Sequence, residues 1–409
     1  MNKSVKLGDI ANIITGPFGS QLHQSDYVEE GIPCIMPQNI GNRTLNMEGI
    51  ARITEKDALR LKRYIVEEND IVYARRGDVE KHAFISPEYA GSLCGTGCMR
   101  VRVNTKKAYP LYVSFFLNRP ECKRWISQNA VGSNMPNLNT EILNKVPIEL
   151  PEIGEQQEIS HLLQSIDSKI QINNVTCSEL EAMAKTIYDY WFVQFDFPDE
   201  NGKPYRTSGG EMVWNEQLKR EIPKGWEVGR LCDIANITMG QSPTGESYND
   251  IGDGLIFYQG RTDFGLRFPT PRMYTTAPTR FAQKGDILLS VRAPVGDLNF
   301  AMEDCCIGRG LAALNSKLGS QMHLFYTLTG FQQIFKVMDG NGTTFGSITK
   351  DILFGMAVVI PSDEILKCFD KMVKPIELKI EKCEEEIREL TKLRDWLLPM
   401  LMNGQARAE

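Results

Sequence analysis

The chain of 409 residues is longer than one hydrophobic core usually supports, and 42% hydrophobic with 24% charged residues is the usage of a folded protein. Its formal net charge of −6 excludes a protein that coats nucleic acid by bulk charge alone, although a local basic face is compatible with it. Ten cysteines without a C-x-x-C pair, and only four histidines, give no spacing that supports a zinc site or a disulfide framework, so we expect no metal site. We find neither a secretory signal nor a run of about 20 apolar residues, and therefore expect a cytoplasmic protein without membrane spans.

A first module opens with the run Leu7–Ile13, and we expect it to extend over residues 1–151. Within it, an apolar strand leads into a polar run that contains Gln38 and Asn39. Side-chain amides can pair bidentately with adenine in the major groove of DNA. Both residues are therefore candidate DNA-binding residues, with ordinary loop polarity as the alternative.

A second polar cluster follows the repeated run 69–72 and contains Arg75, Arg76 and Lys81. A basic loop at the end of a strand can hold a phosphate or reach a base edge, so these three are further candidates. Acidic residues in the same run leave a surface ion pair as the alternative. Ser133 and Asn134, small polar residues after a glycine, also suit a phosphate contact.

Residues 155–192 contain no proline or glycine, which predicts a long helix, and we assign the helical segment to residues 152–192. The spacing of its apolar residues alternates between four and three, as in the seam of a coiled coil. Asn173 at a seam position would help to set register. An amphipathic helix packed on its own domain is the alternative. The seam positions are Ile159, Leu163, Ile166, Ile170, Asn173, Cys177, Leu180, Ala184, Ile187 and Trp191.

A segment rich in aromatic and turn residues follows, and we assign residues 193–230 to a central linker with a hairpin around Asn201 and Gly202. The number of large apolar side chains also suggests a docking surface for a partner protein. The candidate partner-binding residues are Trp191, Phe192, Phe195, Trp214 and Trp226.

The second module, expected over residues 231–361, repeats the first. The register changes along the repeat, so that the second copy is 14 residues shorter (224 minus 210) and the difference falls in the middles of the modules. The repeated runs are 231–237 with 7–13 (offset 224), 285–288 with 69–72 (offset 216) and 342–361 with 132–151 (offset 210).

Candidate DNA-binding residues recur in this second module at the corresponding strand ends. Arginine pairs bidentately with guanine, and glycines on both sides of an arginine allow a close backbone approach. The candidates are Gln259, Arg261, Arg292 and Arg309, with Thr343 and Thr344 as phosphate contacts.

A second long helix is expected over residues 363–402, within a final segment 362–409. Pro375 either kinks this helix or marks a late start, and Arg394 interrupts its apolar seam. Paired helices of forty residues would form a rigid spacer of about 60 Å. An antiparallel pair would place the modules at opposite ends around a pseudo-twofold axis. The seam positions are Phe369, Val373, Ile376, Ile380, Cys383, Ile387, Leu390, Arg394, Leu397 and Leu401.

Sequence signatures of catalysis are absent, since no phosphate-binding loop, nucleophile elbow or H-E-x-x-H pair occurs. A large chain without such a site suggests recognition rather than catalysis. Two alternatives remain open. One is a nuclease that uses Asp199, Glu200 and Lys203, and the other is a structural protein that dimerises through its helical seams.

Taken in order, these runs resemble the specificity subunits of type I restriction-modification enzymes over essentially the whole chain. The resemblance rests on the duplicated openings and closings, on residues 155–158 and 397–401, and on the central runs 195–198, 202–205, 208–210 and 222–226. It implies an α/β (α+β) fold with two tandem target-recognition domains joined by two long helices in an antiparallel coiled coil.

The resemblance also implies a function. Each domain would read one half of a bipartite double-stranded DNA site, and the chain itself would be a recognition subunit without catalysis and without a cofactor. Methyltransferase subunits, expected to be two, and restriction or translocase subunits would bring S-adenosylmethionine, ATP and Mg²⁺. The second helix departs from the pattern at Pro375 and Arg394, and it lacks the Glu-Gln-Gln-Glu run that opens the first.

Overall fold

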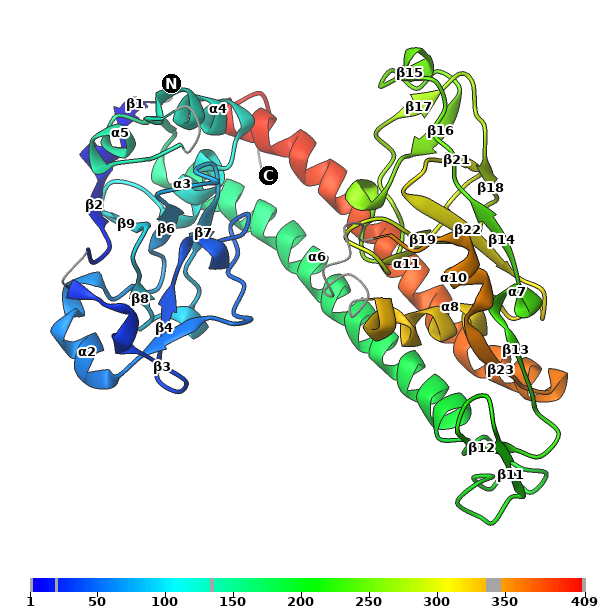
Figure 1. The fold of residues 1–409 in the computed structure, drawn as a ribbon. Helices are drawn as coiled ribbons and strands as arrows, with labels where there is room; N and C mark the ends of the chain where they lie inside the picture. Colours follow the sequence, from blue (N-terminus) through cyan, green and yellow to red (C-terminus); the bar gives the residue numbers. More distant parts are fainter. Residues whose placement is uncertain (1–2, 19–20, 133–135, 336–346, 407–409) are drawn as a thin grey trace. The chain divides into compact units, whose positions relative to one another are not determined.

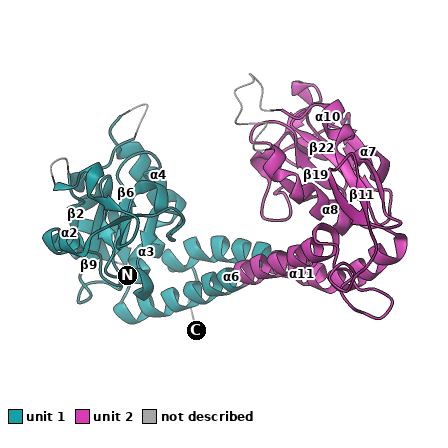
Figure 2. Ribbon diagram, turned by 60° about the horizontal axis from the view of Figure 1, so that its bottom comes forward, with its two compact units in different colours: residues 1–172, 387–409 teal, residues 173–386 magenta. Residues whose placement is uncertain are grey.

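The computed structural model describes residues 3–18, 21–132, 136–335 and 347–406 (Figure 1). The chain divides into two compact units (Figure 2): unit 1 comprises residues 1–172 and 387–409, and unit 2 comprises residues 173–386. Ser133, Asn134, Thr343 and Thr344, which the sequence suggested as phosphate contacts, lie outside the described residues.

Unit 1 contains a mixed module of short strands and helices. Its strands are β1 (Lys3–Lys6), β2 (Ala11–Thr15), β3 (Tyr27–Val28), β4 (Ile32–Ile35), β5 (Ala51–Ile53), β6 (Ile71–Ala74), β7 (His82–Phe84), β8 (Leu93–Cys94), β9 (Cys98–Val103) and β10 (Pro147–Leu150). Its helices are α1 (Leu7–Ile10), α2 (Glu55–Arg60), α3 (Pro110–Leu117), α4 (Pro120–Asn129) and α5 (Thr140–Asn144), with 3₁₀ turns η2 (Gln24–Asp26), η3 (Pro37–Asn39), η4 (Lys62–Tyr64) and η5 (Pro87–Tyr89).

Two sheets and a strand pair organise the unit 1 module. One sheet has the order β2-β9-β6-β7 with antiparallel neighbours, the other has the order β3-β5-β4-β8, and β1 pairs with β10. Helix α3 is buried along its whole length. The main core joins this helix and the first sheet to Ile159 and Leu163 of the first long helix and to Leu398 and Leu401 of the second. The module is therefore packed on the parts of the long helices that belong to its own unit.

Unit 2 contains the second module and the central linker. Its strands are β11 (Met212–Asn215), β12 (Arg220–Pro223), β13 (Glu227–Arg230), β14 (Ala235–Met239), β15 (Tyr248–Asn249), β16 (Leu255–Tyr258), β17 (Tyr274–Thr275), β18 (Phe281–Ala282), β19 (Ile287–Ser290), β20 (Leu298–Phe300), β21 (Cys305–Ile307), β22 (Leu311–Ser316) and β23 (Ala357–Ile360). Its helices are α7 (Leu231–Ile234), α8 (Gln321–Gly330) and α10 (Lys350–Gly355), with the π turn η6 (Asp189–Val193) and the 3₁₀ turns η7 (Gly245–Ser247) and η8 (Arg261–Asp263).

The predicted repeat is confirmed by the antiparallel sheet and the terminal strand pair of each module. Sheet β14-β22-β19-β20 has the same order and pairing as β2-β9-β6-β7, and β13 pairs with β23 as β1 pairs with β10. The bounds of β14 and β2 differ by 224, those of β19 and β6 by 216, and those of β23 and β10 by 210. The two modules thus share one fold, with their length difference inside it.

The repeated opening is explained by a short capped turn. Leu7 and Ile10 of α1 are buried, and Asp9 between them accepts a hydrogen bond from the backbone N of Lys6 at 3.0 Å. In α7 the equivalent Asp233 accepts one from the backbone N of Arg230 at 2.7 Å. An acidic side chain at the third position of a helix satisfies a backbone donor that has no partner inside the helix.

The two long helices are α6 (Ile153–Tyr188) and α11 (Asp363–Met402), and each contributes to both units. Within unit 2, Asn173 Nδ2 donates to Glu386 Oε2 at 2.8 Å, and Cys177 Sγ donates to the backbone O of Ile380 at 3.9 Å. Residue numbers rise on one helix while they fall on the other, so the helices are antiparallel there. Asn173 is buried at the seam, as its predicted role in register requires.

Helix α11 runs without interruption through Pro375, so the late start considered for it is wrong. Helix α6 stops four residues before the predicted end, and the π turn η6 carries the chain into the linker. In the linker, the backbone N of Asp199 donates to the O of Lys203 at 2.8 Å, which confirms the predicted hairpin around Asn201. No helix among the described residues has the length and apolar run needed to cross a membrane.

Candidate nucleic-acid interface

In unit 2, two parallel strands end at the same edge of their sheet. Strands β16 and β21 lie side by side, so Gln259 and the loop 308–310 follow them together. The backbone N of Gly308 donates to the O of Tyr258 at 2.8 Å, and that of Gly310 donates to the O of Gln259 at 3.1 Å. The side chains of Gln259 and Arg309 are exposed at this edge.

A third strand brings Arg292 to the same place. Strand β19 is antiparallel to β22, and the backbone N of Val291 donates to the O of Gly310 at 2.8 Å. Arg292, the next residue, is exposed. The fold thus brings together Gln259, Arg292 and Arg309, which the sequence predicted separately.

This edge borders a groove of about 780 Å³ that is lined by Arg261, Arg292 and Asp297, among others. Arg261 and Asp297 form an ion pair, although half of the Arg261 side chain remains exposed. A neighbouring hollow of about 350 Å³ is lined by Gln259 and Arg272. The groove and the hollow together therefore combine cations, a carboxylate and an amide, which can read hydrogen-bond donors and acceptors on base edges.

Unit 1 has the same edge between β4, β8, β6 and β9. The backbone N of Gly95 donates to the O of Ile35 at 2.9 Å, and that of Arg75 donates to the O of Gly97 at 2.7 Å. These bonds correspond to those of Gly308 and Val291 in unit 2. Arg76 follows and is exposed, as Arg292 is.

The equivalence of Arg76 and Arg292 is also seen in their bridges. Arg76 pairs as an antiparallel bridge with Asn137, and Arg292 pairs in the same way with Ser347. The residues differ by 216 in number, which is the offset of the strands before them. Each module therefore presents one exposed arginine at the same point of its fold.

Close backbone packing explains a glycine at this edge in both modules. A Cβ atom on Gly16 would collide with the backbone O of Gly95, and one on Gly240 would collide with the backbone O of Gly308. Both glycines donate to the facing strand at 2.9 Å, to Cys98 and Leu311 respectively. The end of each opening run is thus fixed by sterics rather than by ligand contact.

The structure corrects the prediction for Asn39. This residue is only 2% exposed, and its side chain accepts from the backbone N of Met36 at 3.0 Å and donates to the backbone O of Asn46 at 3.1 Å. Its amide is thus used to hold the loop, because a buried amide needs internal partners. Gln38 beside it is exposed and remains a candidate.

Arg75 and Lys81 also make contacts within unit 1. Arg75 Nε donates to the backbone O of Leu138 at 3.2 Å, and the guanidinium lies 4.6 Å from the ring centre of Phe18. Burial, together with the charge of Arg76, lowers the pKa of Arg75. Lys81 forms an exposed ion pair with Asp78 at 2.8 Å, which is the alternative considered for it.

The aromatic residues of the linker are mainly internal. Trp191, Phe192, Phe195 and Trp226 are at most 9% exposed. Phe192 meets Phe369 with ring centres 5.0 Å apart, and Trp226 lies 5.7 Å from Phe195. The expectation of an exposed docking surface is therefore corrected for these four residues, which bury their rings in the core of unit 2.

Trp214 differs from them, since 55% of it is exposed on strand β11. Its indole nitrogen donates to Glu216 at 3.1 Å. It remains the one candidate of the predicted partner set whose ring a partner could reach.

The residues of the nuclease alternative form a turn. Asp199 Oδ1 accepts from the backbone N of Asn201 and of Lys203, at 2.8 Å each, which is an ordinary role for an aspartate at a tight turn. Across the described part of the chain, no three histidine, cysteine, aspartate or glutamate side chains are grouped as a metal site would need.

Sequence reasoning missed two arginines that contact the long helices, the half-buried Arg43 and the buried Arg267, as well as Asp297 and Arg272 beside the groove. Arg267 is 2% exposed, yet its surroundings cannot be read from its neighbours in sequence. One signal was present: the two arginines are separated by 224 residues, the offset of the module openings.

Comparison with known proteins agrees with this geometry. Residues 2–182 and 223–389 match the family described as "Type I restriction modification DNA specificity domain". The chain belongs to this family. A putative type I restriction enzyme MjaX specificity subunit from Methanocaldococcus jannaschii is 29% identical over 390 residues, which cover 93% of this chain and 88% of that protein. The MjaIX specificity subunit of the same organism is 25% identical, covering 99% of this chain and 93% of its own length.

A solved structure supports the fold of this specificity-domain protein. The crystal structure of a type I restriction-modification S subunit from M. genitalium aligns over 98% of this chain and 96% of its own, with a TM-score of 0.59 and 16% identity. The predicted resemblance and the predicted function as a specificity subunit are confirmed by the family match. Specificity subunits recognise DNA and leave catalysis to other subunits, as the sequence suggested.

Proposed function

We propose that the modules at residues 1–151 and 231–361 each read one half of a bipartite double-stranded DNA site. The observation that carries this proposal is the duplicated strand edge, where Arg76 and Arg292 occupy equivalent exposed positions. Two copies of one reading edge in one chain suit a site with two separate halves, because each copy can carry its own set of side chains.

Within each edge, different side chains have different tasks. Gln259 can pair bidentately with adenine, and Arg261 or Arg292 with guanine. Arg309, between two glycines, suits a phosphate, and phosphate contacts set register without reading sequence. In the first module Gln38 and Arg76 are the candidates for base edges, while Arg75 and Lys81 are left to loop structure and phosphate contacts.

The helical segments 152–192 and 362–409 and the linker 193–230 would hold the modules and receive partner subunits. We propose two methyltransferase subunits as partners, with restriction or translocase subunits joining them in the cytoplasm. These subunits would bring S-adenosylmethionine, ATP and Mg²⁺, and much of the positive surface that an acidic DNA reader lacks. Trp214 is the linker residue proposed to contact one of them.

The proposal is tested by long-read methylation sequencing of DNA from cells that express the chain with its cognate methyltransferase. A bipartite motif that depends on the chain is expected. Arg292→Ala should relax one half of the motif and Arg76→Ala the other, because each arginine belongs to one module. The control is Arg230→Ala, which changes an exposed arginine at the end of β13.

Two other results would contradict this function. If the chain-dependent motif has no gap, or if Arg292→Ala weakens both halves equally, one module does not read one half-site. If no methylation depends on the chain and the arginine variants are silent, a structural protein that dimerises through its helices gains support.

A further inference from the structure

In unit 2, the buried arginine Arg267 joins the module to both long helices. Its Nη1 donates to Glu181 Oε1 of α6 at 3.1 Å, and its Nη2 forms an ion pair with Glu377 of α11. Its guanidinium also lies 4.3 Å from the ring centre of Phe325 and 5.1 Å from that of Phe300. Only 3% of the side chain is exposed, so water hardly competes for these contacts.

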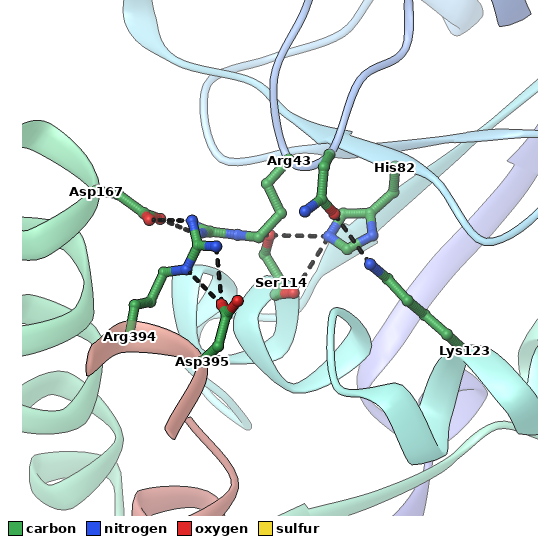
Figure 3. Close-up of polar contacts among 8 residues, drawn as sticks. Arg43, His82, Ser114, Lys123, Asp167, Arg394 and Asp395 are labelled. Atoms are coloured by element: carbon green, nitrogen blue, oxygen red, sulfur yellow. Dashed lines mark hydrogen bonds and ion pairs between the residues drawn. The ribbon is translucent and has the colours of Figure 1, made fainter. Parts of the chain in front are cut away.

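In unit 1, Arg43 likewise joins the module to the long helices, and Figure 3 shows it beside Asp167 and Ser114. Its Nη1 forms an ion pair with Asp167 of α6, its Nε donates to Ser114 Oγ at 3.1 Å, and its guanidinium lies 3.4 Å from the ring centre of Phe115. From α11, Arg394 donates to the other oxygen of Asp167 at 3.1 Å. The module, α6 and α11 are joined here through one carboxylate.

The two contacts are equivalent in the repeat. The backbone O of Arg43 accepts from Phe84 N at 3.4 Å, and that of Arg267 accepts from Phe300 N at 2.8 Å. Arg43 and Arg267 differ by 224 residues, the offset of the openings. Phe115 and Phe325 differ by 210, the offset of the closings, and so do Asp167 and Glu377.

Both arginines lie on the loop that carries a candidate reading residue. Arg267 follows Arg261 by six residues, and Leu266 beside it lines the groove. Arg43 follows Gln38 by five residues. One end of each loop thus faces the proposed half-site, while the other end is held on a long helix.

We propose that Arg43 and Arg267 are positioning residues that fix each reading loop on the helical spacer, and thereby fix the spacing between the two half-sites. This inference rests on the proposed function. Base pairs follow one another at about 3.4 Å, so a loop that shifts by a few ångströms reads a neighbouring base pair. A planar guanidinium held by two carboxylates or by a carboxylate and a ring permits little such shift.

The test is methylation mapping with Arg267→Met and Arg43→Met, and with Arg230→Met as the same chemical change outside the contact. The wild-type chain must first give its bipartite motif, which tests the proposed function separately. The Arg267→Met and Arg43→Met variants are each expected to keep both half-site sequences. Each should also gain methylation at sites where the gap between the half-sites is one base pair longer or shorter. Arg230→Met is expected to keep a single gap.

Two outcomes would overturn the inference while leaving the proposed function intact. A single wild-type gap in both variants would show that the arginines do not set spacing. A change in the half-site bases read by the altered module would show that the arginine acts inside the reading groove instead.

Loss of all methylation would point to misfolding, so milder variants complete the test. Glu377→Gln and Asp167→Asn retain side-chain size and remove one charge from each contact. If they relax the gap, the inference holds. If they retain the wild-type gap, or abolish methylation as well, the arginines serve folding only and the inference is wrong.

Discussion

The two modules hold the long helices with the same arginine but with the opposite order of charges. In unit 1 the carboxylate of Asp167 lies between two cations, Arg43 and Arg394. In unit 2 the cation of Arg267 lies between two carboxylates, Glu181 and Glu377. The duplicated fold has thus retained the module's arginine and one carboxylate, Asp167 or Glu377, while the other long helix supplies a cation in unit 1 and a second carboxylate in unit 2.

The charge order changes the state of each arginine. Burial lowers the pKa of Arg43, and the nearby Arg394 also lowers it while Asp167 opposes them, giving a value of about 10. Burial also disfavours the cation of Arg267, but the carboxylates of Glu377 and Glu181 outweigh it and raise the pKa. Both arginines stay charged at neutral pH, and the carboxylates around Arg267 favour its charged form more than the surroundings of Arg43 do.

The largest effect is expected from Arg267→Met. It leaves Glu181 and Glu377 facing one another without their shared cation, and breaking a buried pair in this way costs about 3 kcal/mol or more. Urea unfolding should show unit 2 losing this stability, while Arg230→Met changes little. If the Arg267→Met variant unfolds at the same urea concentration as the wild-type chain, the two carboxylates do not need the arginine, and the prediction is wrong.

Acidification should act on both units through one buried histidine each, His82 and His323. Burial lowers the pKa of both to about 3 from an ordinary value of 6.5. Between these values the unfolded chain binds the additional proton, so stability falls as pH falls, by about 1.4 kcal/mol per pH unit for each histidine.

The two units should differ in the size of this acid effect. Burial raises the pKa of Glu181 and of Asp370 in unit 2, and a raised carboxyl pKa has the opposite sign, so stability is gained as pH falls through it. Urea midpoints measured from pH 7 to pH 5 check this. His82→Gln should reduce the slope, and an unchanged slope would show that His82 is protonated when folded.

Arg43→Met should cost less than Arg267→Met, about 1 to 2 kcal/mol, because Asp167 keeps Arg394 as a partner. The double variant Arg43→Met with Arg394→Met should cost more than the sum of the single changes, since only then is Asp167 left without a cation. Urea unfolding of the four proteins gives this coupling, and simple additivity would contradict the shared role of Asp167.

The smallest effect is expected from Arg309→Ala. Loss of one phosphate contact should lower the salt slope of DNA binding by about 1 with the half-site sequences unchanged. Binding of the assembled complex at a series of salt concentrations measures this slope. A changed half-site sequence would instead assign Arg309 to a base edge.

Much of the fold follows from local pattern. The repeated run Leu7–Ile13 predicts that the chain contains two related modules, and in the structure the same short capped turn, α1 and α7, opens both. The seam residues predict the long helices, and α11 has the expected bounds of residues 363–402. The exposure of single side chains was harder to predict. Asn39 was proposed to contact DNA and Trp191 to contact a partner protein, yet both side chains are buried.

By itself, the sequence determined the duplication, the two long helices and the family, because these depend on residues near one another and on repeated order. Tertiary structure decided which polar residues meet at the strand edge, since Gln259, Arg292 and Arg309 follow the ends of three different strands, β16, β19 and β21. It also decided the contacts of Arg43 and Arg267 with the helices. Asp167 follows Arg43 by 124 residues and Glu377 follows Arg267 by 110, and a charge pair over such a separation exists only once the chain has folded.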